Sequence, residues 1–256
     1  MSQDPSRREI AVVILAAGKG KRMGNPDLAK VLVPLKGTPL VGHVLQTVKG
    51  LDCERVVAIV GHQREAVADY VKSVTPTARI AIQEEQLGTG HAVQQTEQAL
   101  ADFSGDVVIL SGDVPLLSTD TLTMLIKDHQ SSGAALTVLT TRVPDPTGYG
   151  RIVRTSDDHL ARIVEHKDAS DAELPIDEIN SGIYVVDRAT LFDALSQVRN
   201  DNRQQEYYLT DIAGILNDGG QRVNIFLADD WHEVHGINTP ADLDYADEIL
   251  SIREGA

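Results

Sequence analysis

The sequence predicts an α/β fold in which a mixed, mostly parallel sheet is flanked by helices. Short apolar runs recur along the first 140 residues, and segments with apolar residues at helical spacing lie between them. Such an alternation indicates parallel strands joined by crossover helices. The pattern then changes to two short runs joined by a polar turn, which predicts a small antiparallel lobe beside the sheet.

Five apolar runs are the expected strands of the parallel sheet. They are bounded by polar or turn-forming residues, as buried strands usually are. They span residues 10–15, 55–60, 79–82, 107–110 and 136–139.

Two helices have clear start signals. Ser118 precedes a segment whose apolar residues recur at helical spacing, and serine is a favoured N-cap residue. Thr239 and Pro240 precede a second such segment, and proline is well suited to the first helical turn. Both segments are expected to be amphipathic helices.

The antiparallel lobe is expected over about residues 142–180. Residues 150–154 and 160–164 form a candidate hairpin around a polar turn, and the polar stretches 168–178 and 200–206 are expected to be surface loops. Because apolar elements continue on both sides of these loops, we expect one domain over residues 1–256, with a flexible start at residues 1–9.

Composition excludes several classes of protein. The 256 residues are 42% hydrophobic and 24% charged, without repeats, which excludes disordered, collagen-like and solenoid chains. The longest apolar run, residues 10–17, is far shorter than the roughly 18 residues that a membrane helix needs. The single cysteine, Cys53, and the absence of an apolar leader predict a cytoplasmic location.

The charge distribution is uneven. A net charge of −15 argues against nucleic acid or an anionic membrane as a partner. Residues 18–36, however, hold five basic side chains against Asp27 alone. This window would attract a small polyanion, although a solvated basic loop would have the same composition.

A glycine-rich turn follows the first expected strand. Residues 16–20 read Ala-Ala-Gly-Lys-Gly, and successive N–H groups in such a turn can bind a phosphate. Met23 stands where a dinucleotide fingerprint needs its third glycine, and no P-loop spacing is present. These failures count against a nicotinamide-dependent oxidoreductase and an ATPase, while a simple tight turn remains an alternative.

Asp113 is the leading candidate metal ligand. It follows the buried run 107–110 at the carboxyl end of that strand, the edge where open α/β sheets bind ligands. Mg²⁺ binds one or two protein oxygens together with phosphate and water. A turn aspartate before Pro115 is the alternative reading.

A series of collinear motifs carries a family resemblance over about residues 10–250. They include LAAGKG at 15–20, KVL at 30–32, EQLGTGHA at 85–92, GDVP at 112–115, DPTGYGR at 145–151, VEHKD at 164–168, EINSG at 178–182, EYYLTD at 206–211 and EVHGIN at 233–238. With these motifs the chain resembles the uridylyltransferase domain of bacterial N-acetylglucosamine-1-phosphate uridylyltransferases, within the sugar-nucleotide pyrophosphorylases.

The resemblance implies a role for each matching residue. Leu15, Ala16, Ala17 and Gly18 would bind the nucleotide through backbone groups, and Gln83, Gly88 and Thr89 would bind its base. Arg22 and Lys30 would bind phosphates as catalytic residues, and Asp113 and Asn238 would hold Mg²⁺. Sugar-binding residues would be Gly150, Glu165, Asn180, Tyr208 and Thr210. Gln83 would recognise uracil, whose edge offers a donor and acceptors that a glutamine amide can match.

The resemblance also implies a Rossmann-like sheet, a sugar-binding lobe and a reaction. UTP and N-acetylglucosamine 1-phosphate would give UDP-N-acetylglucosamine and pyrophosphate, with Mg²⁺ as cofactor. The alternatives are a pyrophosphorylase for glucose or N-acetylgalactosamine 1-phosphate and a non-catalytic nucleotide-sugar sensor. Two residues, Ala29 and Ser111, depart from the family pattern. This sequence holds no hexapeptide repeats of the β-helix acetyltransferase that forms the trimer in the bifunctional proteins, so we expect a monomer or weak homo-oligomer.

Overall fold

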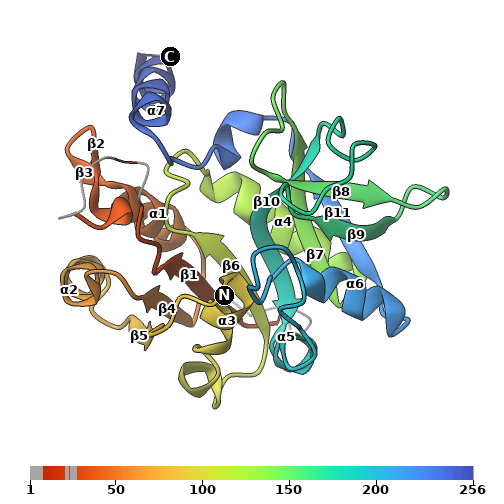
Figure 1. Cartoon of the computed structure of the whole chain (residues 1–256). Coiled ribbons are helices and arrows are strands. Elements are labelled where there is room, and N and C mark those ends of the chain that lie inside the picture. Colours follow the sequence, from red (N-terminus) through yellow and green to blue (C-terminus); the bar gives the residue numbers. More distant parts are fainter. Residues whose placement is uncertain (1–7, 21–22, 24–27, 256) are drawn as a thin grey trace.

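A nine-stranded mixed sheet forms the centre of the molecule in a computed structural model that describes residues 8–20, 23 and 28–255 (Figure 1). Seven strands form the continuous path, in the order β11 (Val223–Leu227), β7 (Leu136–Arg142), β10 (Glu178–Asp187), β6 (Asp106–Ser111), β1 (Ile10–Ala16), β4 (Arg55–Val60) and β5 (Arg79–Ile82).

The sheet is mostly parallel, as the sequence predicts. Strand β1 pairs in parallel with β6 on one side and with β4 on the other, and β4 continues in parallel to β5. Strand β10 runs antiparallel to both of its neighbours, β6 and β7. The carboxyl ends of β1, β4, β5 and β6 therefore meet at one edge of the sheet.

Both faces of the sheet are buried. Along β1, Ala11 and Val13 pack in one hydrophobic cluster, and Val12 and Ile14 pack in another. The first cluster includes side chains of α3 (Thr89–Gln94), α5 (Arg188–Leu195) and α6 (Asp211–Asp218). The second includes side chains of α1 (Leu40–Lys49), α2 (Arg64–Val74) and α4 (Thr119–Ser132). Strands covered on both faces are continuously apolar, which is the pattern that the sequence contains.

Both helix-start predictions are confirmed. The Ser118 Oγ accepts a hydrogen bond of 3.1 Å from the backbone N–H of Thr121, which caps α4. The Thr239 Oγ1 accepts one of 3.2 Å from the N–H of Asp242 at the start of α7 (Pro240–Gly255). The remaining short elements are β2 (Pro34–Leu35), β3 (Thr38–Pro39) and the 3₁₀ helices η2 (Lys30–Leu32), η3 (Gln98–Leu100) and η4 (Trp231–Val234).

The expected hairpin is present as β8 (Gly150–Arg154) and β9 (Leu160–Val164). Strand β8 also pairs with the start of β10, where Gly150 is opposite Asn180. One long strand therefore belongs to both the lobe and the main sheet. The Asn217 side chain, on α6, donates to the Leu160 carbonyl over 2.7 Å and ties the hairpin to the helical layer.

The described chain begins with defined contacts. Arg8, expected to lie in a flexible start, forms an ion pair of 3.0 Å with the buried Asp106 and another with Asp187. The Glu9 carbonyl accepts from the Asp106 N–H over 2.9 Å. Residues 1–7 lie outside the described ranges.

None of the helices within those ranges combines the length and apolar character that crossing a membrane requires.

Candidate nucleotide-binding site

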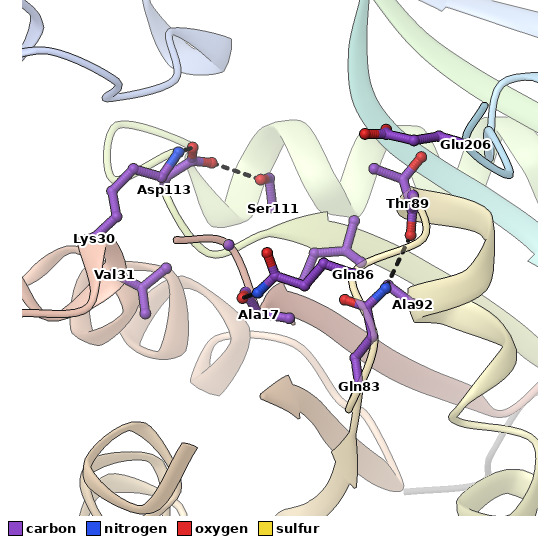
Figure 2. Close-up of a pocket in the computed structure, with 13 residues that line it drawn as sticks. Ala17, Lys30, Val31, Gln83, Gln86, Thr89, Ala92, Ser111, Asp113 and Glu206 are labelled. Atoms are coloured by element: carbon purple, nitrogen blue, oxygen red, sulfur yellow. Dashed lines mark hydrogen bonds and ion pairs between the residues drawn. The ribbon is translucent and has the colours of Figure 1, made fainter. Parts of the chain in front are cut away.

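A cavity of about 300 Å³ opens at the carboxyl edge of the parallel strands (Figure 2). Its lining comes from the end of β1 and the turn after it, the 3₁₀ helix η2, the segment between β5 and α3, α3 itself, the end of β6 with the residues that follow it, and the loop before α6. The lining residues are Leu15, Ala17, Gly18, Lys30, Val31, Gln83, Gln86, Gly88, Thr89, Ala92, Ser111, Asp113 and Glu206.

One end of the cavity is a polar cluster built around Lys30. The Lys30 ammonium forms an ion pair with the Asp113 carboxylate and donates to Asn238 Oδ1 over 3.1 Å. The Ser111 Oγ donates to the other oxygen of Asp113 over 2.5 Å. The Asp113 carboxylate and the Asn238 amide oxygen thus converge on the Lys30 ammonium. Two oxygens in this arrangement can bind a cation, and the Lys30 ammonium can bind an anion.

A close backbone approach positions Lys30. Gly20 has a φ of +58°, and a Cβ on Gly20 would lie 2.5 Å from the Lys30 Cβ. Only glycine combines this conformation with this proximity. The Ala29 N–H, which precedes Lys30, donates to the Gln63 side chain over 2.8 Å. The glycine-rich turn and η2 are therefore packed directly against each other.

The opposite end of the cavity contains the Gln83 amide. Its Nε2 donates to the Gly88 carbonyl over 3.0 Å and lies 3.2 Å from His91 Nδ1. These contacts use the amide nitrogen, so Gln83 Oε1 is the atom left to hydrogen bond with a ligand. The sequence led us to expect that the amide would both donate to and accept from a base. In this arrangement it is placed to accept a hydrogen bond from an N–H of the base.

Gly88 brings the Gln83 segment against a distant loop. It has a φ of +113°, and a Cβ on Gly88 would lie 2.5 Å from the Tyr207 carbonyl oxygen. The Tyr207 N–H donates to the Leu87 carbonyl, and the Tyr207 carbonyl accepts from Gly90, both over 2.8 Å. This pairing brings Glu206 to the cavity.

The sugar-binding residues expected from the resemblance do not line the cavity: Gly150, Glu165 and Asn180 belong to the lobe, and Tyr208 and Thr210 immediately precede α6. Asn180 is opposite Gly150 between β10 and β8 and donates to the Tyr184 hydroxyl over 2.7 Å. Thr210 donates to Glu165 over 3.1 Å. Tyr208 has a partner outside the expected sugar-binding set, since its hydroxyl donates to Asp168 over 3.1 Å.

The lobe side of the site is strongly acidic. Burial raises the pKa of Glu165, and the nearby charges of Asp211, Asp168 and Glu206 raise it further. Burial also raises the pKa of Asp211 to about 6, with contributions from Asp201 and Asp168. This environment disfavours additional negative charge.

The match between the expected site and the cavity is incomplete in identifiable ways. Ala16, expected to hold the nucleotide through its backbone, is 2% exposed and does not line the cavity, and its side chain packs in the core. Gln86 and Glu206 line the cavity without having been singled out, and Gln86 donates to the Ala17 carbonyl over 2.6 Å. Arg22 lies outside the described residues.

A metal site made only of His, Cys, Asp or Glu is absent from the described ranges, where no three such side chains cluster suitably. A cation site at Asp113 would therefore combine one carboxylate with the amide oxygen of Asn238. Such a pair suits Mg²⁺, which completes its shell with water and phosphate oxygens.

Residues 11–238 match the family model described as "Nucleotidyl transferase". The chain belongs to the nucleotidyl transferase family. Among the most similar curated relatives of this nucleotidyl transferase are two described as "Bifunctional protein GlmU". The one from Streptomyces coelicolor is 49% identical over 248 residues, which are 96% of this chain and 51% of that protein. The one from Exiguobacterium sp. is 47% identical over 241 residues, 94% of this chain and 52% of that protein. The chain thus spans about half the length of these relatives.

The fold of this nucleotidyl transferase is also found among solved structures. A UDP-glucose pyrophosphorylase complexed with UDP-glucose superposes with a TM-score of 0.77 over 96% of this chain and 99% of that one, at 16% sequence identity. At that identity the likeness concerns the fold alone. It confirms the Rossmann-like α/β class that the sequence predicts.

Proposed function

We propose that this nucleotidyl transferase joins UTP and N-acetylglucosamine 1-phosphate to give UDP-N-acetylglucosamine and pyrophosphate. The observation that carries the proposal is the convergence of Gln83, Lys30 and Asp113 on one cavity. These residues come from separate motifs of the sequence resemblance, and the similarity to the two GlmU proteins over 94–96% of the chain supports the same assignment.

The cavity suits a nucleotide in one orientation. A base with an N–H donor, such as uracil at N3, pairs with the Gln83 Oε1. The triphosphate then extends towards Lys30, and Arg22 in the same basic segment is proposed to bind it as well. The sugar ring of the sugar phosphate lies on the lobe side, where Glu165 and Asn180 are available to its hydroxyl and acetamido groups, and its phosphate is directed towards Lys30 and away from the acidic residues.

The chemistry needs no general base. An oxygen of the sugar phosphate, already anionic, attacks the α-phosphorus, and the bond to the departing pyrophosphate breaks. Alignment of the two phosphates and neutralisation of their charge supply the rate enhancement. Lys30 contributes a positive charge at the end of the cavity that we assign to the phosphates.

Asp113 and Asn238 fit a divalent metal, because their oxygens already converge on the cationic Lys30 nitrogen. When bound there, Mg²⁺ would neutralise phosphate charge and orient the reacting groups. Lys30, released from Asp113, would then be available to a phosphate oxygen.

The test is pyrophosphate release measured with each of UTP, CTP, ATP, GTP and dTTP against a panel of sugar 1-phosphates. We expect the highest kcat/KM with UTP and N-acetylglucosamine 1-phosphate. A higher value with glucose or N-acetylgalactosamine 1-phosphate would support the rival pyrophosphorylases. Nucleotide-sugar binding without pyrophosphate release from any pair would support a sensor.

A further inference from the structure

Glu206 places a carboxylate in the cavity that the proposed chemistry does not use. It lines the cavity beside Gly88 and Thr89. Figure 2 shows its side chain extending over Thr89, with the carboxylate directed into the cavity and away from its own loop. Across the described part of the chain, no hydrogen bond or ion pair reaches this carboxylate.

The backbone that carries Glu206 is firmly held. Asn202 Oδ1 accepts from the Glu206 N–H over 3.1 Å, and Asn202 Nδ2 donates to the Glu206 carbonyl over 2.6 Å. On its other side, Tyr207 pairs with the backbone of Leu87 and Gly90. The side chain is therefore attached to a fixed point on the rim of the cavity.

The local backbone conformation also indicates positioning. Gln205, immediately before Glu206, has a φ of +55°, in the left-handed region that non-glycine residues rarely adopt. Such a conformation is unfavourable for a non-glycine residue and persists only where surrounding contacts impose it. The Asn202 and Tyr207 contacts impose it here and aim the next side chain at the cavity.

The location of this carboxylate defines what it can bind. A carboxylate accepts hydrogen bonds and repels anions, so a phosphate is a poor partner for it. Glu206 is also close enough to Glu165 for their charges to interact, which places it on the lobe side of the cavity. Hydroxyl groups are the neutral donors that both the ribose and an acceptor sugar provide.

We propose that Glu206 is a specificity-determining residue that accepts hydrogen bonds from substrate hydroxyls at the junction of the nucleotide cavity and the lobe. This inference rests on the proposed function. The hydroxyls belong either to the ribose of UTP or to the ring of the sugar phosphate, and deoxy analogues distinguish these two sources.

The experiment compares the unmodified protein with Glu206→Ala, Glu206→Gln and the control Glu85→Ala. Glu85 is an exposed carboxylate on the same connection before α3, and it does not line the cavity. For each protein, kcat/KM is measured with UTP and 2′-deoxy-UTP, and with N-acetylglucosamine 1-phosphate and its 3-, 4- and 6-deoxy analogues. Thermal melting checks that every variant is folded.

In the unmodified protein and in Glu85→Ala, we expect one deoxy analogue to lose at least about tenfold in kcat/KM, as loss of a hydrogen bond to a charged group does. In Glu206→Ala the penalty for that same analogue should fall below about threefold. Glu206→Gln, which keeps one acceptor and the side-chain shape, should retain an intermediate penalty.

The outcome identifies the hydroxyl. A penalty relieved only with 2′-deoxy-UTP assigns Glu206 to the ribose, and one relieved only with a deoxy sugar assigns it to the acceptor. The inference is overturned if folded Glu206→Ala retains every penalty, or if no deoxy analogue is penalised in the unmodified protein. Failure of the proposed function is distinct, because it appears as no pyrophosphate release from the unmodified protein with intact substrates.

Discussion

Lys30 and Asp113, 83 residues apart in the sequence, form an ion pair at one end of the cavity, and Lys30 also donates to Asn238 over 3.1 Å. Three separate segments thus meet at a single cationic nitrogen. The ion pair lies at the edge of the sheet rather than in the core, so its residues can be changed without opening a core cavity.

Asp113→Asn is therefore expected to impair turnover far more than folding. Asparagine keeps the shape of the side chain but removes the charge that binds a cation. We expect kcat at saturating substrates and Mg²⁺ to fall on the order of 10³-fold, with only a small change in Tm. Asp120→Asn, at an exposed position in α4, is the control and should keep normal turnover. Near-normal turnover in Asp113→Asn would remove Asp113 from the catalytic site.

Gly88→Ala tests the close approach between the two sides of the cavity. The new Cβ would lie 2.5 Å from the Tyr207 carbonyl oxygen at a residue with φ of +113°. We expect a loss of about 2–4 kcal/mol in the free energy of unfolding and weaker UTP binding, measured by denaturant titration and calorimetry.

Gly133→Ala is the matched control for this substitution. Gly133 has a φ of +63°, but nothing lies within 4 Å of its added Cβ. It should lose only about 1 kcal/mol, the backbone term alone, and bind UTP normally. Equal losses in the two variants would show that contact with Tyr207 is unimportant.

Asp211→Asn should change the pH dependence of stability. Burial raises the pKa of Asp211 to about 6 in the folded protein, above the value of about 3.9 for an unperturbed aspartate. The folded state then holds the proton more strongly, so ionisation of Asp211 reduces stability as the pH rises from about 4 to about 6. We expect the variant to gain roughly 1 kcal/mol over the unmodified protein between pH 4.5 and pH 7.5, after allowance for solvent screening. A difference that is constant with pH, measured by urea denaturation, would contradict this effect.

Glu165→Ala should reduce discrimination between sugars. Glu165 is hydrogen bonded to Thr210 at the edge of the lobe, where it is proposed to bind the acceptor. We expect the preference in kcat/KM for N-acetylglucosamine 1-phosphate over glucose 1-phosphate to narrow, with the KM for UTP nearly unchanged. Glu173→Ala, which removes an ion pair with Arg162 elsewhere in the lobe, should leave the preference intact. A raised KM for UTP with unchanged sugar preference would place Glu165 at the nucleotide instead.

The parallel strands and the hairpin could be predicted because each has a local signature. The ranges 55–60, 79–82, 150–154 and 160–164 match the observed strands at both ends. Strand β10 (Glu178–Asp187) was not foreseen, because Asn180, Ser181 and Gly182 interrupt its apolar run. The register shifts between Asn180 and Ile183, so these polar residues occupy an irregular part of the strand. These polar residues conceal the strand from a prediction based on apolar runs.

The site could be predicted where chemistry depends on the residue type and its place on the sheet. Asp113 and the turn after β1 are examples, since both follow buried parallel strands. The Ala16 side chain does not line the cavity, because side chains alternate along β1 and that of Ala16 packs in the same cluster as Ile14, so its expected role through the backbone stays a prediction. Glu206 begins the EYYLTD motif, but its place in the cavity could not be predicted, because it depends on contacts between residues 202–207 and 87–90 that no local pattern encodes.

The most direct test of the proposed activity is the ratio of kcat/KM for N-acetylglucosamine 1-phosphate to that for glucose 1-phosphate, measured with UTP as pyrophosphate release. A site built around Glu165 and Asn180 penalises a sugar that leaves buried polar groups unpaired by about 1–3 kcal/mol per group. We expect a ratio of at least about tenfold. Equal efficiency with the two sugars, or no release of pyrophosphate from either, would contradict the assignment.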